Sequence, residues 1–570
     1  MKAHLLHRSR DFDWKWALQA AAEREARRTG RRSYQSQSVD PRSGLPWNAE
    51  ALTTDLALTT LFNAMARDDD CVFEVSRKVL LAGVTGDLET IRYRQAILQD
   101  CLNQPAVTRE LYAVAVEAMQ KPRGSYLGFL SRYPDTVLRD AIEAMATFLE
   151  CLKRLRRVAD LHAHEFVSEG WTGFFAMLKR DLGDEYFTLL EDHLEELRLR
   201  NGELLSAELG QANKGSRYVL HRVPYRRWTW WAWWTGLFEE KPPVYSFELH
   251  PRDEAGAQAL AALRNRGISL AANALGQSAD HVRDFFGMLR AELAFYVGCV
   301  NLHEELVRKG EPTCMPVPAV ADARRLSCRG LYDVGLALSV DRRVVGNDAN
   351  ADGKDLVIIT GPNAGGKSTF LRSVGLAQLM MQSGMFVPAE SFSGSLCDGL
   401  FTHYKREEDV SMESGKFDEE LSRMSDIVDR ITSHSMVLFN ESFAATNERE
   451  GSEIAQQIVS ALVENRVRAF YVTHMYELAH GFYERRMGNV LCLRAGRQAD
   501  GARTFKMMEG EPLPTSFGED LYKSVFTAEI AHRVTDDPRA PGTASESRQS
   551  NHHVACIFII VLVVPLLRLL

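Results

Sequence analysis

The sequence has no excess of basic residues and little glycine or proline, and each shortage excludes a class of protein. Lysine and arginine number 68 against 76 aspartates and glutamates, for a formal net charge of −8 over 570 residues. A protein that coats nucleic acid non-specifically is expected to be basic, so any contact with DNA or RNA needs a local basic patch. The 39 glycines and 19 prolines are too few for a collagen-like or proline-rich chain.

Cysteine is also sparse, and the nine cysteines are scattered along the chain. None of them forms a CxxC pair or a Cys/His cluster, which leaves no support for a zinc site. A sparse, odd-numbered set of cysteines is typical of reduced thiols in a cytoplasmic protein. The first 16 residues contain no apolar run. We therefore expect no signal peptide and a cytoplasmic location.

One long apolar run occurs near the C-terminus, where residues 554–567 read VACIFIIVLVVPLL. A helix of this length would be about 21 Å long, short of the ~30 Å hydrocarbon core of a bilayer, and Pro565 interrupts it. The preceding residues 536–553 are polar and are typical of a linker. Three interpretations stay open for the run: a membrane anchor, a tail that docks on protein, and a non-native end of the reading frame.

Composition and periodicity divide the chain into a helical part and an α/β part. Residues 1–47 are rich in arginine and serine with little periodicity, so we expect partial disorder there. Helical spacing of apolar residues follows, interrupted by strand-like alternation within 203–250, and later apolar strands alternate with helices. We predict a multidomain protein with an α-helical domain over 48–330, an α/β domain over 331–535, and a linker and tail over 536–570.

A phosphate-binding loop follows a short run of β-branched residues. Residues 356–360 (LVIIT) are typical of a buried parallel strand, and residues 361–369 (GPNAGGKST) complete the pattern GxxxxGK[ST] before a predicted helix. The glycines let the backbone wrap a phosphate, and the helix N-terminus adds partial positive charge. In this pattern Lys367 reaches the β- and γ-phosphates, and Ser368 offers its hydroxyl to Mg²⁺. The predicted cofactors are ATP and Mg²⁺. The predicted nucleotide-binding residues are Gly361, Pro362, Asn363, Ala364, Gly365, Gly366, Lys367, Ser368 and Thr369.

A second buried-strand run, residues 435–439 (SMVLF), ends in Asn440 and Glu441. In phosphate-loop proteins this strand usually ends in Asp-Glu, with the aspartate in the Mg²⁺ shell and the glutamate orienting the attacking water. An asparagine can still accept a hydrogen bond from metal-bound water, but it brings no charge. We therefore predict Ser368 and Asn440 as the metal residues and Glu441 as the catalytic base, and expect hydrolysis to be slow.

A third strand run, residues 469–472 (AFYV), ends in Thr473 and His474. A histidine just past a core strand can hydrogen-bond the γ-phosphate and respond to its loss. We predict His474 as the second catalytic residue, with a purely structural histidine as the alternative.

These three segments together resemble the MutS family of DNA mismatch-repair ATPases, whose nucleotide domain is of the ABC type. The resemblance is close over 345–526. The segment 359–369 (ITGPNAGGKST) matches the family's variant of the loop, including the uncommon Pro-Asn, and 473–478 (THMYEL) matches its histidine strand. Residues 516–518 (SFG) resemble the family's C-terminal dimer-forming segment. Upstream, 87–100 (DLETIRYRQAILQD) looks like the start of the family's helical core and lever domain.

The chain also departs from the family's pattern. Asn440 stands where the family has aspartate, and within 442–451 only Thr446 and Gly451 match the family's glycine-rich segment well. About 350 residues precede the phosphate loop, which is too few for the mismatch-reading and connector domains as well as the core. The resemblance therefore does not carry over direct recognition of a mismatch.

The family's trans-acting signature, Ser-Thr-Phe-x-x-Glu, is present in altered form. Phe417 and Glu420 fit it, but Gly415 and Lys416 fall on Ser-Thr, and Ser414 lies one residue out of register. Ser414 and Gly415 are the predicted trans signature.

The strongest basic patch lies within residues 210–236, which contain five basic residues, five tryptophans and no acidic residue. Arginines could hold a nucleic-acid backbone while tryptophans stack on exposed bases, and in MutS relatives the DNA clamp emerges from this part of the core. A buried tryptophan cluster with a solvated arginine rim, or a membrane-interface belt, are the alternatives. The predicted DNA-binding residues are Arg217, Arg222, Arg226 and Arg227.

The resemblance implies an ATP-dependent DNA-binding protein of the mismatch-repair type, with branched or mismatched DNA as its partner. ABC-type domains hydrolyse ATP between two subunits, which implies a homodimer whose closure the helical lever passes to a DNA clamp. The alternative is a nucleotide-switched scaffold that hydrolyses slowly and binds a protein, or a membrane through residues 554–570. The acidic net charge, the missing mismatch reader and the apolar tail favour this alternative.

Overall fold

The computed structural model forms two units, Met1–Ser516 and Phe517–Leu570, and every residue that it describes lies in the first. The described residues are 1–30, 44–83, 86–120, 134–199, 204–209, 215–221, 250, 252–406, 415–498 and 501–514. They form a helical part and an α/β part, so the prediction of a multidomain protein with these two kinds of part is confirmed at that level.

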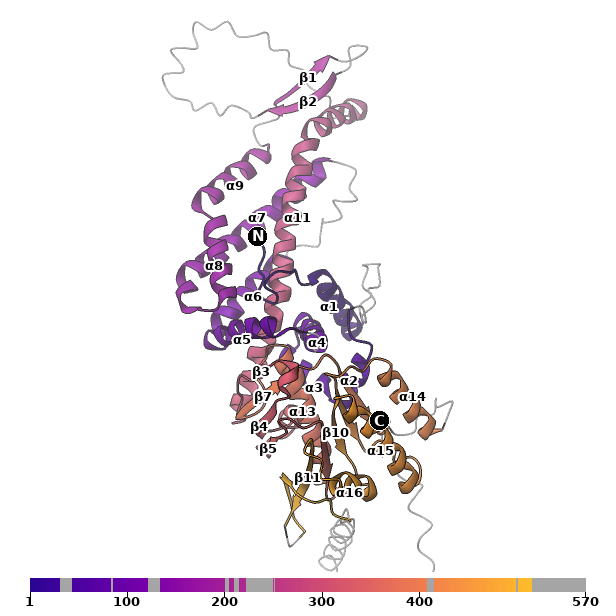
Figure 1. Cartoon of the computed structure of the whole chain (residues 1–570). Helices are drawn as coiled ribbons and strands as arrows, with labels where there is room; N and C mark the ends of the chain where they lie inside the picture. The colour runs from indigo at the N-terminus through magenta and orange to yellow at the C-terminus, as the bar shows by residue number, and fades with distance from the viewer. Residues whose placement is uncertain are drawn as a thin grey trace, which may run out of the picture. The chain divides into compact units, whose positions relative to one another are not determined.

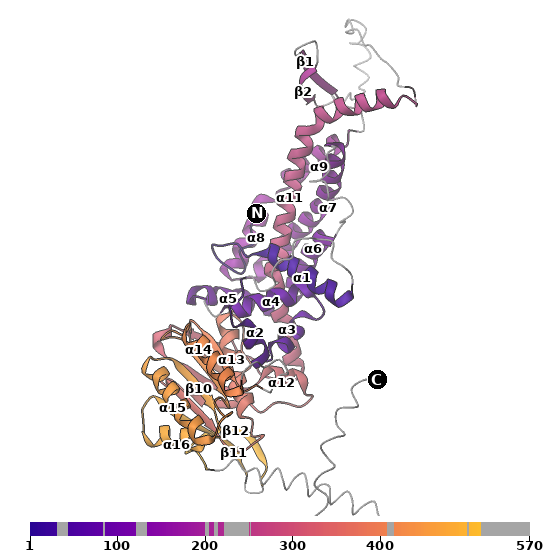
Figure 2. The ribbon, with the colours of Figure 1, turned by 90° about the vertical axis from the view of Figure 1, so that its right-hand side faces the viewer.

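The helical part is built around α11, which runs from Glu254 to Arg308 over 55 residues. Helices α3, α4, α6 and α7 pack along it, and Figures 1 and 2 show α7 following its course. Its most apolar stretch has the length and composition of a membrane span, but that stretch is buried inside the protein, as in the core helix of a helical domain. The other helices of this part are α1 (Trp14–Thr29), α2 (Ala49–Asp55), α3 (Leu58–Ala66), α4 (Asp70–Ala82), α5 (Leu88–Asn103), α6 (Pro105–Gln120), α7 (Pro134–His162), the 3₁₀ turn Ala163–Glu165, α8 (Glu169–Asp181) and α9 (Asp184–Leu197).

An antiparallel hairpin lies within the stretch 203–250 where alternation predicts strands, and residues 222–249 of that stretch are outside the described ranges. Strands β1 (Leu204–Leu209) and β2 (Gly215–His221) pair with each other, and β2 contacts α11. The tryptophans of the basic patch lie outside the described residues.

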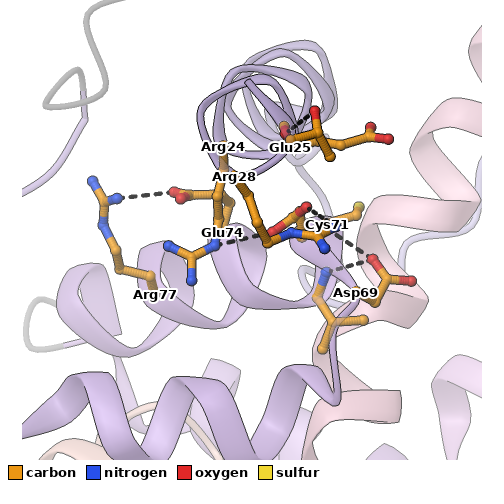
Figure 3. Close-up of polar contacts among 10 residues, drawn as sticks. Arg24, Glu25, Arg28, Asp69, Cys71, Glu74 and Arg77 are labelled. Atoms are coloured by element: carbon orange, nitrogen blue, oxygen red, sulfur yellow. Dashed lines mark hydrogen bonds and ion pairs between the residues drawn. The ribbon is translucent and has the colours of Figure 1, made fainter. Parts of the chain in front are cut away.

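Residues 1–30, within the stretch 1–47 where partial disorder is expected, pack against the helical part. Leu5 and Leu6 are fully buried, and the main-chain N–H of Leu6 donates to the buried carboxylate of Glu292 at 3.3 Å. Helix α1 packs on α4, where Arg24 and Arg28 both pair with Asp70 at 3.1 Å. Figure 3 shows Arg24 and Arg28 at this contact, together with Asp69 and Glu74. Two arginines of this segment thus pair with an acidic residue of α4, a pairing that local periodicity does not reveal.

The α/β part contains a six-stranded sheet in the order β12-β11-β6-β10-β9-β8, in which only β12 is antiparallel to its neighbour. A smaller four-stranded sheet has the order β3-β7-β4-β5. Because β3 and β4 belong to it, the α/β part begins before residue 331; these strands lack the apolar runs that mark the later ones. The strands are β3 (Val317–Ala319), β4 (Leu326–Leu331), β5 (Asn347–Asn350), β6 (Leu356–Thr360), β7 (Ser391–Ser395), β8 (Leu400–Tyr404), β9 (Met436–Asn440), β10 (Arg468–Val472), β11 (Val490–Arg497) and β12 (Arg503–Glu509).

Both faces of the central parallel strands are covered, which explains their continuous apolar sequence. On one face, Ile358, Phe439 and Tyr471 pack with apolar residues of α14, α15 and α16, which Figure 2 shows beside the sheet. Alternate residues such as Val357 and Leu438 join the core that contains α13 and the helical part. The remaining helices are α12 (Val334–Ser339), α13 (Lys367–Gln382), α14 (Lys416–Val428), α15 (Glu448–Glu464) and α16 (Tyr476–Glu484), with a 3₁₀ turn at Ala321–Ala323.

Candidate nucleotide-binding site

The predicted phosphate loop lies between β6 and α13, so strand, loop and helix occur in the predicted order. The backbone has positive φ at Gly361 (119°), Ala364 (56°) and Gly366 (89°). A Cβ atom on Gly361 would lie 2.8 Å from the main-chain nitrogen of Ala495 in β11. The loop therefore needs glycine both for its conformation and for its close approach to the neighbouring strand.

Lys367 is buried inside this loop, with only 5% of the residue exposed. Its ammonium group donates hydrogen bonds to the main-chain carbonyls of Gly361 at 3.1 Å and Pro362 at 3.0 Å. Burial lowers the pKa of Lys367 to about 8. The carbonyls thus hold the charge where the loop would receive a phosphate group, and a phosphate would be a stronger partner than two neutral oxygens.

The two predicted metal residues lie in contact. The hydroxyl of Ser368, on the first turn of α13, donates to the side-chain oxygen of Asn440 at 2.8 Å. Neighbouring ligands in an octahedral Mg²⁺ site, each 2.0–2.1 Å from the ion, are about 2.9 Å apart. The spacing of these oxygens fits such an ion, although neither brings a negative charge.

Glu441 and His474 also lie together, because β9 and β10 are parallel neighbours that end at the same edge of the sheet. The His474 Nε2 atom is 3.0 Å from Glu441 Oε1. This hydrogen bond is the main cause that lowers the pKa of the Glu441 carboxyl, while burial opposes it. Glu441 is therefore held in its charged form, the form that can accept a proton from water.

Two residues of β12 also contact the loop, and sequence patterns do not identify them. Arg503 donates from its Nε atom to the Asn363 carbonyl at 3.2 Å. Phe505, with 39% of the residue exposed, lies next to Gly366. No local motif marks either residue, because β12 is positioned by its pairing with β11 and its contacts with β5, which lie elsewhere in the sequence.

A cavity of about 390 Å³ opens beside the loop on the side of Phe505. Its walls combine apolar side chains with a few polar groups, the composition of many small-molecule sites. It is lined by Leu331, Tyr332, Asp333, Leu336, Val340, Arg342, Arg343, Val344, Val345, Asn347, Ala364, Gly366, Thr369, Phe370, Ser373 and Phe505.

The remaining predicted residues lie away from these groups or outside the described part of the chain. Gly415 is exposed and precedes the first turn of α14 as its N-cap. Arg217 is exposed on β2, where it pairs with Glu208 at 3.2 Å. The residues outside the described ranges are Ser414, Arg222, Arg226 and Arg227, together with the apolar run 554–567.

Comparison with known proteins places these parts in one family. The sequence model of the MutS2 N-terminal domain matches residues 86–309, and that of MutS domain V matches residues 357–533. Two DNA mismatch repair proteins MutS are similar: that of Prochlorococcus marinus is 32% identical over 182 residues, and that of Synechocystis sp. 40% identical over 125. MutS protein homolog 4 of Mus musculus is 31% identical over 152 residues.

These matches are partial. They cover 31%, 22% and 27% of this chain, and 20%, 14% and 16% of the respective relatives, so the chain matches a fifth or less of each relative's length. The two matching domains nevertheless lie in separate parts of the chain, one helical and one α/β. The chain is a MutS-related protein.

Proposed function

We propose that the chain binds ATP with Mg²⁺ in the loop 361–369 and hydrolyses it, and that this cycle controls binding to DNA. The observation that carries the proposal is the convergence of three strand ends. Beyond β6, β9 and β10 lie the loop, the Ser368–Asn440 contact and the Glu441–His474 pair. The match to MutS domain V, the ATPase domain of that family, supports the same chemistry.

Each residue has a role that its contacts support. The loop N–H groups and the Lys367 ammonium bind the triphosphate, and the cavity beside Phe505 receives the adenine, whose face stacks on the ring. Ser368 and Asn440 would hold Mg²⁺, which would neutralise part of the charge of the triphosphate. Glu441 accepts the proton of the attacking water, and His474 orients Glu441 and hydrogen-bonds the γ-phosphate.

We further propose that two copies close around ATP, with the Gly415 end of α14 facing the partner's nucleotide, in the cytoplasm. DNA of branched or mismatched structure is the proposed partner, held by the patch that includes Arg217. The family match supports this assignment, whereas the net charge of −8 opposes it. The second candidate is a nucleotide-switched scaffold for a protein or membrane partner, which the neutral Asn440 favours because it predicts slow hydrolysis.

The test uses the full chain and its Glu441→Gln variant. We expect the wild type to hydrolyse ATP in a Mg²⁺-dependent manner, and the variant to bind ATP normally while hydrolysis falls by about a hundredfold or more. A gel shift with homoduplex, mismatched and branched DNA, with and without ATP, then separates the two candidates. Salt-sensitive binding to any of these DNAs supports the first, and binding to none supports the scaffold. A wild type that fails to bind ATP contradicts both.

A further inference from the structure

The three residues that carry the catalytic base have an unusual backbone. We call residues 441–443 the base segment. Glu441 has φ 54° and Phe443 has φ 62°, both in the left-handed region that non-glycine residues rarely adopt. Ser442, between them, is fully buried. Such conformations persist only where surrounding groups hold them in place, and they concentrate at functional sites. The contacts of the base segment therefore indicate what positions Glu441.

The base segment is tied to its surroundings at each residue. The Glu441 N–H donates to the Val472 carbonyl at 2.9 Å, and the Ser442 carbonyl accepts from the Tyr471 hydroxyl at 2.8 Å. Both of these partners belong to β10. The Phe443 N–H donates to the carboxylate of Glu420 at 2.9 Å, which ties the segment to α14. One side of the segment is thus held by the sheet and the other by a helix.

His403, a buried residue of β8, adds a second connection between the base segment and α14. Its Nε2 atom lies 2.9 Å from the Glu420 carbonyl, which can only accept, so this nitrogen carries a hydrogen. Burial lowers the pKa of His403 to about 4, so the ring is neutral and its Nδ1 atom carries no hydrogen. The Ser442 hydroxyl donates to the His403 main-chain carbonyl at 2.5 Å, and its oxygen lies 2.8 Å from Nδ1. The His403 ring also stacks on Phe443, with centroids 5.1 Å apart.

Glu420 is therefore bound to the base segment through two of its groups. Its carboxylate holds the Phe443 N–H directly, and its main-chain carbonyl holds His403, which in turn touches Ser442 and Phe443. Glu420 is 4% exposed, and it lies just over one helical turn from Gly415, the N-cap of α14. A shift of this end of α14 must move Glu420, and with it the backbone that carries Glu441.

We propose that Glu420 is a positioning residue for the base Glu441, and that α14 thereby couples its Gly415 end to hydrolysis in the same subunit. This inference rests on the proposed ATPase function. A partner's nucleotide that contacts the Gly415 end would act on the chemistry of this subunit, while ATP affinity stays the same. Neither Lys367 nor the loop 361–369 belongs to the contacts that join α14 to the base segment.

The experiment measures single-turnover ATP hydrolysis and ATP affinity in the full chain. Glu420→Met keeps the length of the side chain but removes the acceptor, and we expect hydrolysis to fall about tenfold with unchanged affinity, because a small misplacement of a catalytic group is costly. Glu420→Gln keeps a neutral, weaker acceptor and should lose about threefold. The matched control is Glu419→Ala, on the same turn of α14, whose carboxylate pairs with Arg423 at 3.5 Å instead of the base segment. It should hydrolyse at the wild-type rate.

A second comparison separates positioning from a general structural role. If Glu420 acts through Glu441, then Glu420→Met causes no further loss when it is added to Glu441→Gln. A further tenfold loss in that background overturns the inference, as does a wild-type rate in either Glu420 variant or an equal loss in Glu419→Ala. If Glu420→Met does not fold, Glu420→Gln in both backgrounds decides the question. Failure of the proposed function gives a different result: no hydrolysis by the wild type, or full hydrolysis by Glu441→Gln.

Discussion

The phosphate loop and the base segment face the same candidate site, but they reach their conformations by different means. In the loop, two of the three positions with positive φ are glycines, Gly361 and Gly366. In the base segment the corresponding residues are Glu441 and Phe443, which pay about 1–2 kcal/mol each for a left-handed backbone. Local sequence thus largely accounts for the conformation of the loop 361–369, which we call the binding half of the candidate site. Contacts from β8, β10 and α14 hold the base segment, which carries the proposed base and which we call the catalytic half. We expect binding to survive changes that hydrolysis does not.

The largest effect should come from the binding half. Lys367→Met removes the buried ammonium, and we expect ATP affinity to fall about a thousandfold, near 4 kcal/mol, because the triphosphate loses its charged partner. The melting temperature without nucleotide should not fall, since the variant no longer buries a charge that only carbonyls satisfy. Titration with a fluorescent nucleotide and a thermal melt measure the two quantities. Unchanged affinity would refute the assignment of the loop.

In the catalytic half, Phe443 tests whether the base segment is strained. Phe443→Ala should destabilise the protein by about 3 kcal/mol, because it removes a fully buried ring that stacks on His403. Phe443→Gly removes the same ring but relieves the left-handed backbone, so it should be about 1 kcal/mol more stable than the alanine variant. Urea unfolding gives both values. An alanine variant more stable than the glycine variant, the usual order in regular structure, would mean that the backbone is unstrained.

Asn440 lies where the two halves meet. Asn440→Asp places a carboxylate next to the Ser368 hydroxyl, where the two oxygens now lie 2.8 Å apart. We expect hydrolysis to rise about tenfold and half-saturation to need less Mg²⁺, since an anionic oxygen is the preferred Mg²⁺ ligand. Steady-state rates across a Mg²⁺ titration measure this, with Asn440→Ala as the control that should be slower than the wild type. A rate unaffected by the aspartate would place the ion elsewhere.

The smallest expected effect is the uptake of protons by Lys367 when the nucleotide binds. Burial sets the pKa of Lys367 at about 8 in the free protein, and a bound triphosphate favours the charged lysine and raises that pKa. Binding at pH 8 should therefore take up about half a proton, and affinity should fall as the pH rises above 8. Calorimetry in two buffers of different ionisation enthalpy measures the uptake. In Lys367→Arg, which stays charged, the same experiment should show none from this position.

Part of this site could be predicted because its residues follow short strands in the sequence. Residues 361–369, Asn440, Glu441 and His474 each come directly after an apolar run, and parallel strands bring such positions to one edge of a sheet. Residues outside this pattern could not be found in this way. Arg503 and Phe505 reach the loop through the β11–β12 pairing, and Glu420 and His403 reach the base segment through helix and sheet packing.

The N-terminal stretch shows the same limit in the fold. Its arginines predict disorder when taken alone, yet Arg24 and Arg28 pair with Asp70, and Leu6 donates to Glu292, partners 42 to 286 residues away. Other predictions stay open because their residues lie outside the described ranges, among them Ser414, the arginines after β2 and the apolar run 554–567.

The sequence by itself determined where the loop 361–369 lies between a strand and a helix, the strand ends that carry Asn440, Glu441 and His474, and the presence of a helical part and an α/β part. It could do so because glycine conformations, helix starts and buried strands depend on neighbouring residues. Only the tertiary structure decided how Glu441 is held. Its left-handed backbone is unfavourable for the local chain, and it persists because Glu420, His403 and β10 hold the segment from distant parts of the sequence.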